Sequence, residues 1–418
     1  MLRRIMTTAV ALLALTLATG ACLAQFALKQ GDRVVFYGDS ITDQRLYTTF
    51  VETFVVTRFP GLNVTFTHSG WGGDRVTGGG GGPIDVRLKR DVLPYKPTMM
   101  TIMLGMNDGS YRAFDEGIFK TYADGYRGIV NTMKGALPNL RMTLIRPSPF
   151  DDVTRAPSFP GGYNSVLVRY GDFVQQLAGE KKLGVADLCT DVVAMLKKAD
   201  ATDPALAQKI IADRVHPGPA GQLTMAACLL KAWKAPALVS SVEIDARAGK
   251  AARTQNCTVS AVTPGSKLTW TQLDKALPMP VDAKDPLFAL VLASSDFEET
   301  LNRQIVRVTG LSGGSYRLSI DGAEVGVYPA ADLAQGVNLA FAATPMAQQA
   351  ARVHALTLSH NQVHFTRWRT VQLPLEWCKS RKSDAALAAM DAWDADIARQ
   401  QRQAARPIPH TYTVEAAQ

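Results

Sequence analysis

Short apolar segments alternate with helix-length segments over the first half of the chain, and this alternation constrains the fold more than any other feature. The predicted strands are 33–37, 63–68, 99–104, 141–145 and 183–187, and the predicted helices between them are 48–59, 84–93, 114–136 and 165–182. Short, continuous apolar strands suit a sheet that is covered on both faces. Strict alternation of strand and helix therefore predicts an α/β fold, with a parallel sheet between two helical layers, over residues 25–236.

The pattern changes after Pro236. Residues 237–345 are predicted to be β-rich, with a strand at 305–308 and a hairpin, 316–320 and 323–327, whose turn is Asp321-Gly322. Asp-Gly suits the positive φ values of a tight hairpin. From residue 346 onward the sequence predicts a helical extension, 346–418, with helices at 346–358 and 384–402. We expect the tail after Pro407 to be extended or disordered.

The first 24 residues have the pattern of a signal peptide. Arg3 and Arg4 precede an apolar run, which is followed by small residues up to Ala24. We expect cleavage after Ala24 and a secreted or periplasmic protein; cleavage before Cys22, as in a lipoprotein, is the less favoured alternative because Thr19 stands where a leucine is usual. No later window holds about 18 unbroken apolar residues, so no membrane span is expected.

Charge and cysteine content narrow the classes of partner. Removal of residues 1–24 takes away two arginines from a chain of net charge +8, which leaves +6. The charges are interspersed, without a run of five or six of one sign, so the sequence predicts a solvated surface and no nucleic-acid groove. Four cysteines would remain, and they allow one or two disulfides or buried free thiols: Cys189, Cys228, Cys257 and Cys378.

No metal site or cofactor is expected. The cysteines lack metal-ligand spacing, and the histidines include no zinc motif. His360 and His364 are four residues apart near one predicted helix, where His354 also lies, and this spacing can bind metal. Without carboxylates nearby in the sequence, a surface or packing role is the preferred interpretation of these histidines.

Polar residues follow the predicted strands where each strand ends. Gly38-Asp39-Ser40 comes directly after the first strand, and Gly105-Met106-Asn107-Asp108 after the third. Ligands of α/β sheets gather at the carboxyl ends of the strands. A serine there can act as a nucleophile, although Ser40 or Thr42 could equally be a helix N-cap. An asparagine amide there can donate toward the same space, although Asn-Asp is also common in turns.

Two further motifs complete the set. Asp213 precedes His216 by three residues, so the carboxylate can fold back to accept the Nδ1–H and leave Nε2 free to take a proton from a serine. His68-Ser69-Gly70 ends the second strand, and Gly70 offers a backbone N–H with no side chain in the way.

These four motifs, in this order, resemble the four blocks of the SGNH hydrolases, also called GDSL esterases. The resemblance covers about residues 31–236 and implies a flavodoxin-like three-layer α/β/α sandwich. It implies that Ser40 is the nucleophile, His216 the general base and then acid, and Asp213 the residue that orients the imidazole. The oxyanion hole would consist of the N–H groups of Ser40 and Gly70 and the side-chain amide of Asn107.

Other residues beside these motifs are interpreted as structural. Asp39 and Asp108 are expected to hold the loops, and His68, which stands where many relatives carry asparagine, to be a satisfied histidine at a strand end. The glycine run 78–82 lacks a phosphate-binding signature, so a mobile loop near the active-site rim is expected. Trp71 can stack on a sugar or pack in the core.

The resemblance leads to an expected function. It implies a secreted serine esterase without a cofactor, and relatives with a signal peptide and this block arrangement favour O-acetyl groups on polysaccharides or oligosaccharides as the substrate. The polar, Pro/Gly-rich surroundings of His216 argue mildly against long-chain lipids. A lipase, lysophospholipase or thioesterase of the same superfamily is the enzymatic alternative, and a mainly glycan-binding protein is the non-enzymatic one.

Overall fold

The computed structural model describes residues 25–417, so the predicted signal peptide and Cys22 lie outside the described residues. Each predicted strand of the first half is present, and the five form one parallel sheet in the order β2-β1-β5-β6-β7. This order is the doubly wound arrangement of flavodoxin-like folds, so the predicted fold class is confirmed. The strands are β1 (Arg33–Gly38), β2 (Thr65–Gly70), β5 (Met99–Met103), β6 (Arg141–Arg146) and β7 (Gly184–Asp187).

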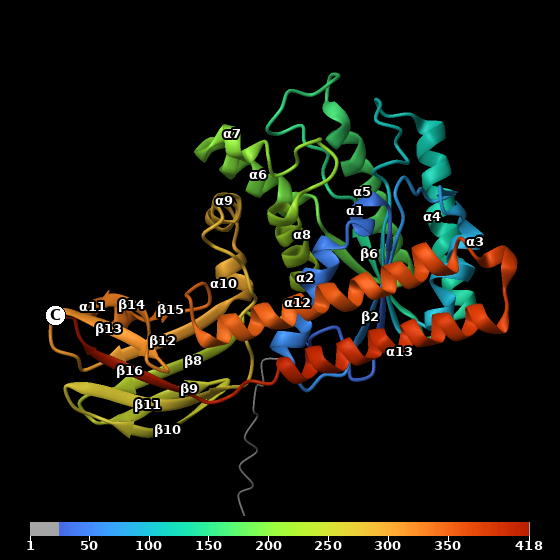
Figure 1. Cartoon of the computed structure of the whole chain (residues 1–418). Coiled ribbons are helices and arrows are strands. Elements are labelled where there is room, and N and C mark those ends of the chain that lie inside the picture. Colours follow the sequence, from blue (N-terminus) through green and yellow to red (C-terminus); the bar gives the residue numbers. More distant parts are fainter. Residues whose placement is uncertain (1–24, 418) are drawn as a thin grey trace, which may run out of the picture.

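Helices cover both faces of this sheet (Figure 1). On one face α2 (Leu46–Arg58) packs against α8 (Pro219–Ala232), and both helices are buried along almost their whole length. On the other face α4 (Glu116–Ala136) packs against α5 (Gly162–Lys181). The remaining helices of this domain are α1 (Ser40–Asp43), α3 (Ile84–Asp91), α6 (Thr190–Thr202), α7 (Pro204–Ala207) and the short η1 (Leu93–Tyr95).

The glycine run is not an irregular loop. It forms a two-stranded ribbon, β3 (Gly78–Gly79) and β4 (Gly82–Pro83), that packs on the Trp71 ring. A Cβ on Gly81 would lie 2.6 Å from that ring. The glycines therefore serve close packing against an aromatic side chain, and the predicted mobility of the segment stays a prediction.

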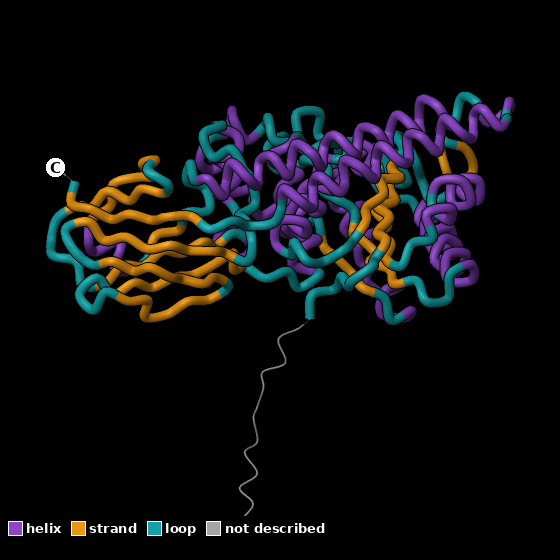
Figure 2. Tube along the Cα trace, turned by 60° about the horizontal axis from the view of Figure 1, so that its bottom comes forward, coloured by secondary structure: helices purple, strands orange, loops and turns teal. Residues whose placement is uncertain are grey.

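Residues after Pro236 form a β-sandwich beside the α/β domain (Figure 2). One sheet is antiparallel in the order β10-β11-β16-β13-β14, and the other is mixed in the order β15-β12-β8-β9. The apolar faces of the two sheets enclose a core of their own, in which the Trp270 and Tyr412 rings stack at 5.0 Å. The strands are β8 (Leu238–Asp245), β9 (Lys250–Gln255), β10 (Cys257–Thr263), β11 (Lys267–Asp274), β12 (Arg303–Thr309), β13 (Ser315–Ile320), β14 (Ala323–Pro329), β15 (Val337–Asn338) and β16 (His410–Ala416).

Two predictions about this region had different outcomes. The hairpin is confirmed, because β13 and β14 pair across Asp321 and Gly322, both with positive φ. The prediction for the tail was wrong: β16 is a central strand, hydrogen-bonded to β11 on one side and β13 on the other. The range 346–418 is therefore not wholly a helical extension. Three short helices in the β-rich range were also missed: α9 (Pro286–Ser294), α10 (Phe297–Leu301) and α11 (Ala330–Gln335).

A pair of long helices leaves the sandwich and returns to it. These are α12 (Pro345–Phe365) and α13 (Arg381–Ala404), joined through a π-helical turn η2 (Thr366–Gln372) and the short η3 (Glu376–Cys378). We call residues 345–404 the helical arm. It lies across the α/β domain beside α2 and the edge strand β2 (Figure 1).

A buried ionic network fixes the helical arm to the α/β domain. Glu52 of α2 is 2% exposed and hydrogen-bonds to His360 Nε2 of α12, while His360 Nδ1 lies 3.2 Å from Asp394 of α13. Gln401 and Asn361 donate to the same carboxylate at 3.0 and 3.2 Å. Although burial opposes the charge, the Glu52 carboxylate raises the pKa of His360 to about 10. The helical arm is therefore held by a buried charged pair, and most of the hydrogen-bonding atoms of this pair have partners.

The four cysteines are free thiols, three of them buried, so the disulfide alternative was wrong and the thiol alternative is confirmed. Among residues 25–417, no helix is long and apolar enough to cross a bilayer.

Candidate active site

Ser40 stands where β1 passes into α1. The chain can turn there because residue 38 is glycine: a Cβ on it would lie 2.7 Å from the Met103 carbonyl and would collide with the Thr42 hydroxyl. Asp39 caps the helix by accepting the Ile41 N–H at 3.0 Å. Ser40 is therefore the first residue of a helix whose start is fixed by its neighbour, as expected for Asp39.

The 213–216 segment folds into a tight turn at the edge of the same space. Arg214 adopts a left-handed conformation (φ 72), and the Asp213 carboxylate accepts the N–H groups of Val215 and His216 at 2.9 and 2.8 Å. An aspartate that bonds to backbone two and three residues ahead stabilises such turns. The turn thus orients the imidazole before any substrate is present.

Ser40, His216 and Asp213 are brought together by this folding. His216 Nε2 lies 2.7 Å from the Ser40 Oγ, and His216 Nδ1 lies 2.6 Å from Asp213 Oδ2. Burial alone would raise the pKa of Asp213, but the hydrogen bonds from His216 and Val215 hold it below its ordinary value. The aspartate is therefore ionised near neutrality, and the imidazole can take the serine proton while its other nitrogen stays hydrogen-bonded.

Asn107 and Asp108 follow β5 and hold the loop 71–77. The Asn107 side-chain amide donates to the Asp74 carbonyl at 3.0 Å, and Asp108 accepts the Val76 N–H at 2.9 Å. An asparagine amide has two N–H bonds, so one remains for another acceptor. The Asn107 oxygen accepts from the Tyr111 hydroxyl at 2.9 Å, which fixes the orientation of the amide. Asp108 is thus a structural partner of the loop, as predicted.

The carboxyl groups behind the serine carry unusual pKa values. Burial raises the pKa of Asp39 to about 8 and that of Asp108 to about 7, against the opposing hydrogen bonds from Ile41 and Val76. The negative potential of Asp108 contributes further to the rise at Asp39. Burial therefore favours the neutral form of Asp39, which limits the negative charge beside the serine.

Gly70 does not face this space. It is buried, and a Cβ on it would collide with the backbone at Asp43. Its carbonyl points to the outer edge of the sheet, where the Arg369 guanidinium lies 3.5 Å away. In a strand, the N–H and carbonyl of one residue point to the same side, so the Gly70 N–H also faces that edge.

Gly73 is the better candidate for an oxyanion-hole glycine. It is exposed, has φ +76, and a Cβ on it would meet nothing within 4 Å. Its N–H makes no hydrogen bond to another residue of the range 25–417. The following residue, Asp74, is the one that Asn107 holds. The position of Gly70 at the end of a strand predicts it for this role, but its N–H faces the edge of the sheet, whereas Gly73 lies in the turn that follows the strand.

Two aromatic side chains near the site, Trp71 and His68, already contact other residues of the protein. Trp71 packs against the glycine ribbon, and the Arg369 guanidinium of the helical arm lies 3.5 Å from its ring centroid. The ring is therefore packed rather than free to stack on a sugar. His68 is buried at the strand end, as predicted, but only half satisfied: Nδ1 lies 2.7 Å from the Thr48 hydroxyl, whereas Nε2 lies 3.6 Å from Glu52 and has no hydrogen-bond partner within residues 25–417.

His360 and His364 also have protein partners. His360 lies between Glu52 and Asp394, and His364 Nε2 is 3.1 Å from the His68 carbonyl oxygen. The packing role predicted for them is confirmed, although the fold supplies the carboxylates that were missing nearby in the sequence. Within the described part of the chain, no group of three or more His, Cys, Asp or Glu side chains has metal-binding geometry.

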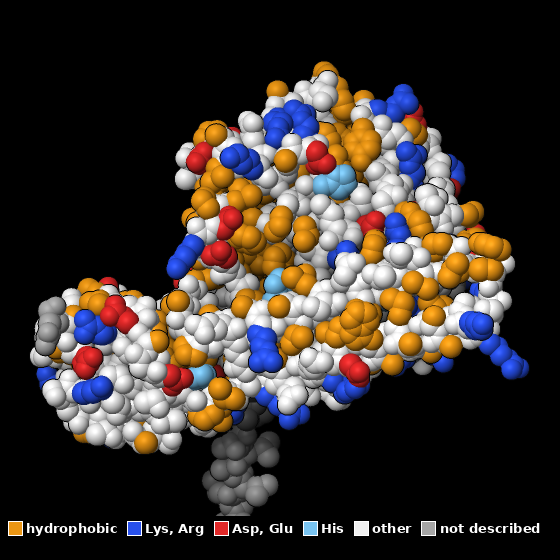
Figure 3. Space-filling view, viewed as in Figure 1, with side chains coloured by type: hydrophobic (Ala, Val, Ile, Leu, Met, Phe, Trp, Pro, Cys, Tyr) orange, Lys and Arg blue, Asp and Glu red, His pale blue; other side chains and the backbone are white. Residues whose placement is uncertain are grey.

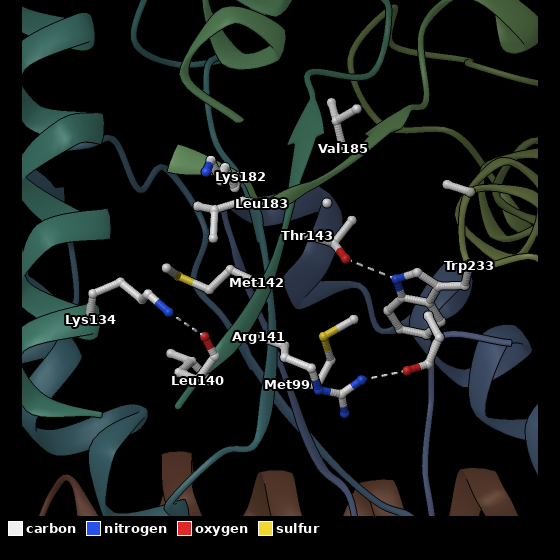
Figure 4. A pocket seen from close by; sticks show the side chains of 13 residues that line it. Met99, Lys134, Leu140, Arg141, Met142, Thr143, Lys182, Leu183, Val185 and Trp233 are labelled. Atoms are coloured by element: carbon white, nitrogen blue, oxygen red, sulfur yellow. Dashed lines mark hydrogen bonds between the residues drawn. The ribbon is translucent and has the colours of Figure 1, made fainter. Parts of the chain in front are cut away.

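A separate cavity of about 370 Å³ lies at the opposite end of the sheet (Figure 4). Its wall includes Met99, Arg141 and Gly184, the first residues of their strands, whereas Ser40 and Asn107 follow strand ends. The Trp233 indole donates to the Thr143 hydroxyl there at 2.9 Å. This cavity is therefore remote from the serine and is not the active site.

A hydrogen-bonded serine, histidine and aspartate at the carboxyl ends of a flavodoxin-like sheet define the hydrolase class whose nucleophile is an activated serine. Comparison with known proteins identifies the family. Residues 36–223 match the model of the GDSL-like Lipase/Acylhydrolase family. These residues thus form a domain of that family, as the sequence motifs indicated, and the protein is a carboxylic ester hydrolase.

Two relatives illustrate the similarity. An acetylxylan esterase of Geobacillus stearothermophilus is 26% identical over 223 residues, which are 48% of this chain and 93% of that protein. The solved structure of BT4096, described as a gut microbial diltiazem-metabolizing enzyme, is 25% identical with a TM-score of 0.81 and matches 93% of this chain and 98% of its own. The similarity to BT4096 thus extends over the sandwich and the helical arm as well as the α/β domain.

Proposed function

We propose that the protein removes O-acetyl groups from polysaccharides or oligosaccharides, with Ser40, His216 and Asp213 as its catalytic triad. Ser40 attacks the ester carbonyl while His216 takes its proton, and Asp213 stabilises the imidazolium that forms. The N–H groups of Ser40 and Gly73 and the free amide N–H of Asn107 would hold the oxyanion. His216 then returns the proton to the leaving alcohol and activates the water that releases acetate. The 2.7 Å contact between Ser40 and His216 is the observation that carries this proposal.

The openness of the site supports a bulky alcohol as the leaving group. The His216 side chain is 33% exposed and that of Asp213 is 55% exposed, so no lid covers them. A polymer can approach such a site without entering a tunnel. The name of the Geobacillus relative, acetylxylan esterase, agrees with this substrate class.

A chain-length series of p-nitrophenyl esters tests the acyl group. We expect the highest kcat/KM with acetate, and a maximum at eight or more carbons would support the lipase alternative instead. Acetate release from acetylated xylan, pectin and chitin oligomers then tests the alcohol. Diltiazem is a suitable small-molecule substrate for comparison, because BT4096 is described as a diltiazem-metabolizing enzyme.

Substitution of the triad tests the mechanism. Ser40→Ala and His216→Ala should each lower kcat by at least about 10³-fold, and the double variant should lose little more, because the two groups act in one proton transfer. Circular dichroism would establish that each variant is folded. A single variant that keeps more than a tenth of wild-type turnover would refute these roles.

We also propose that the protein is exported. The proposal depends on the basic, apolar and small-residue segments of residues 1–24. N-terminal sequencing of the protein from its native host should begin at Gln25, whereas a lipid-modified start at Cys22 would support the lipoprotein alternative.

A further inference from the structure

A groove lies between the start of α2 and the helical arm. Its volume is about 590 Å³, within the range of small-molecule binding sites. Gln44, Arg45 and Thr49 line it from the α/β domain, and Leu358, Gln362 and Trp393 are among the arm residues that line the other side. We call it the arm groove. Neither half of the chain forms it alone.

The arm groove combines exposed apolar surface with side chains that hydrogen-bond to hydroxyl groups. The Trp393 side chain is 58% exposed and that of Leu358 is 45% exposed, so both present apolar surface to the groove. Hydrophobic side chains gather along the arm on the face shown in Figure 3. The amides of Gln44 and Gln362 and the Thr49 hydroxyl can both donate and accept. A sugar ring has an apolar C–H face and a rim of hydroxyls, so this lining suits a sugar.

The inner end of the arm groove is joined to the catalytic histidine. The Gln222 amide donates to Gln44 Oε1 at 2.6 Å and to the carbonyl of Pro217, next to His216, at 3.0 Å. Gln222 also accepts the Tyr47 N–H of α2 at 2.9 Å. One buried side chain thus connects the histidine loop to the residue that begins the groove.

Arg45 is fixed at this inner end in a conformation that non-glycine residues rarely adopt. Its φ is 58, and its guanidinium lies 4.2 Å from the Phe365 ring and donates to the Asn361 carbonyl at 3.3 Å. Its buried Nε has no hydrogen-bond partner within residues 25–417. Left-handed backbone at a non-glycine residue is strained and clusters at functional sites.

The arm groove is formed before any ligand arrives. The Glu52–His360 pair and the packing of α12 on α2 hold its two walls together. A preformed site avoids the entropy cost of ordering its walls on binding.

We propose that the arm groove binds the sugar chain of the ester substrate, with a sugar ring stacked on Trp393 and the chain passing Gln44 and Arg45 to the ester at Ser40. This inference rests on the proposed function and adds to it a binding site that extends into the second half of the chain. The ligand class is an oligosaccharide of several residues, since the groove lies beyond the serine loop.

Substitution of one exposed tryptophan, with another as its control, tests the proposal. Trp393→Ala should raise KM for acetylated xylo-oligosaccharides about tenfold and leave kcat/KM for p-nitrophenyl acetate within twofold, while Trp393→Phe should restore most of the affinity. Trp377, 85% exposed at the tip of the arm and outside the groove, provides the matched control: Trp377→Ala should change neither value.

Other outcomes would overturn the proposal. Equal effects of Trp393→Ala and Trp377→Ala, or an equal loss on both substrates, would show that the groove does not bind the sugar chain. A selective loss on p-nitrophenyl octanoate would assign the groove to an acyl chain. Wild-type protein that hydrolyses p-nitrophenyl acetate but releases no acetate from any oligosaccharide would refute the proposed function and this use of the groove together. A normal wild-type rate with an unaffected Trp393→Ala would refute the groove alone.

Discussion

Glu52→Gln should weaken the attachment of the helical arm in a pH-dependent way. The substitution keeps the size of the side chain and one acceptor oxygen, which can accept from Gln401 or from Asn361 but not from both, and it removes the charge that pairs with His360. Glu52 and His360 are 2% and 5% exposed, so water cannot replace the lost interaction. Removal of one partner of a buried ion pair typically costs about 3–5 kcal/mol.

The pKa of His360 gives a second estimate of how much the Glu52–His360 pair contributes to the free energy of unfolding. Against the opposing effect of burial, Glu52 and Asp394 together raise this pKa from 6.5 to about 10, and at 1.36 kcal/mol per pH unit the net difference is worth about 5 kcal/mol, which the two carboxylates share. Because the folded-state pKa is the higher one, this stabilisation is fully present below about pH 6.5 and is lost as the pH rises toward 10. The same pairing lowers the pKa of Glu52. The stabilisation that follows from this lowered pKa is present above about pH 4.5 and is lost in acid.

Urea denaturation of wild type and Glu52→Gln at pH 6.0 and pH 9.5 would measure the effect, with hydrogen exchange of α12 and α13 as a local readout. We expect a loss of 3–5 kcal/mol at pH 6.0 and a much smaller difference at pH 9.5, since the wild type has then lost most of the stabilisation itself. Asp124→Asn, which breaks the exposed Lys120–Asp124 pair, is the control and should cost at most about 0.5 kcal/mol at either pH. An equal loss for Glu52→Gln at both pH values would refute the reasoning.

Three further outcomes are expected. Asn107→Ala should lower kcat by about 10²–10³ with little change in KM, because an oxyanion donor acts mainly in the transition state, and steady-state kinetics would measure this. Gly73→Ala should reduce kcat while Gly70→Ala should mainly reduce the melting temperature, because a Cβ at residue 70 collides with the backbone at Asp43; the reverse pattern would restore Gly70 as the oxyanion donor. Under native conditions Cys378 should react first with Ellman's reagent, because burial raises the pKa of the other three thiols, whereas denatured mature protein should show four.

The strands and the polar residues at their ends could be predicted because both depend on local sequence. An apolar run of five residues specifies a buried strand, and the residue after it must lie at the carboxyl edge of a parallel sheet. Ser40 and Asn107 were placed in this way, and His216 was found from its three-residue spacing to Asp213. The choice between Gly70 and Gly73 as oxyanion donor could not be made from the sequence, since it depends on how many residues the chain needs to leave the strand and turn back.

Contacts between segments that are far apart in the chain could not be predicted from the sequence. The pairing of Glu52 with His360 joins residues 308 positions apart, and no local pattern indicates it. The strand at the end of the chain was missed for the same reason: a seven-residue segment after a long helix becomes a strand only because β11 and β13 leave a gap for it. Arg369 likewise reaches Trp71 only through the fold of the arm.

The position of β16 between β11 and β13 has a consequence for biosynthesis. The ribosome must complete the whole arm before the sandwich receives its middle strand, so the α/β domain emerges and can fold while the sandwich is still open. Until residues 410–416 arrive, β11 and β13 expose unpaired edges to other nascent chains. Truncation by even one strand length at this end should therefore cause aggregation, whereas the core of the esterase domain consists mostly of residues upstream of Pro236.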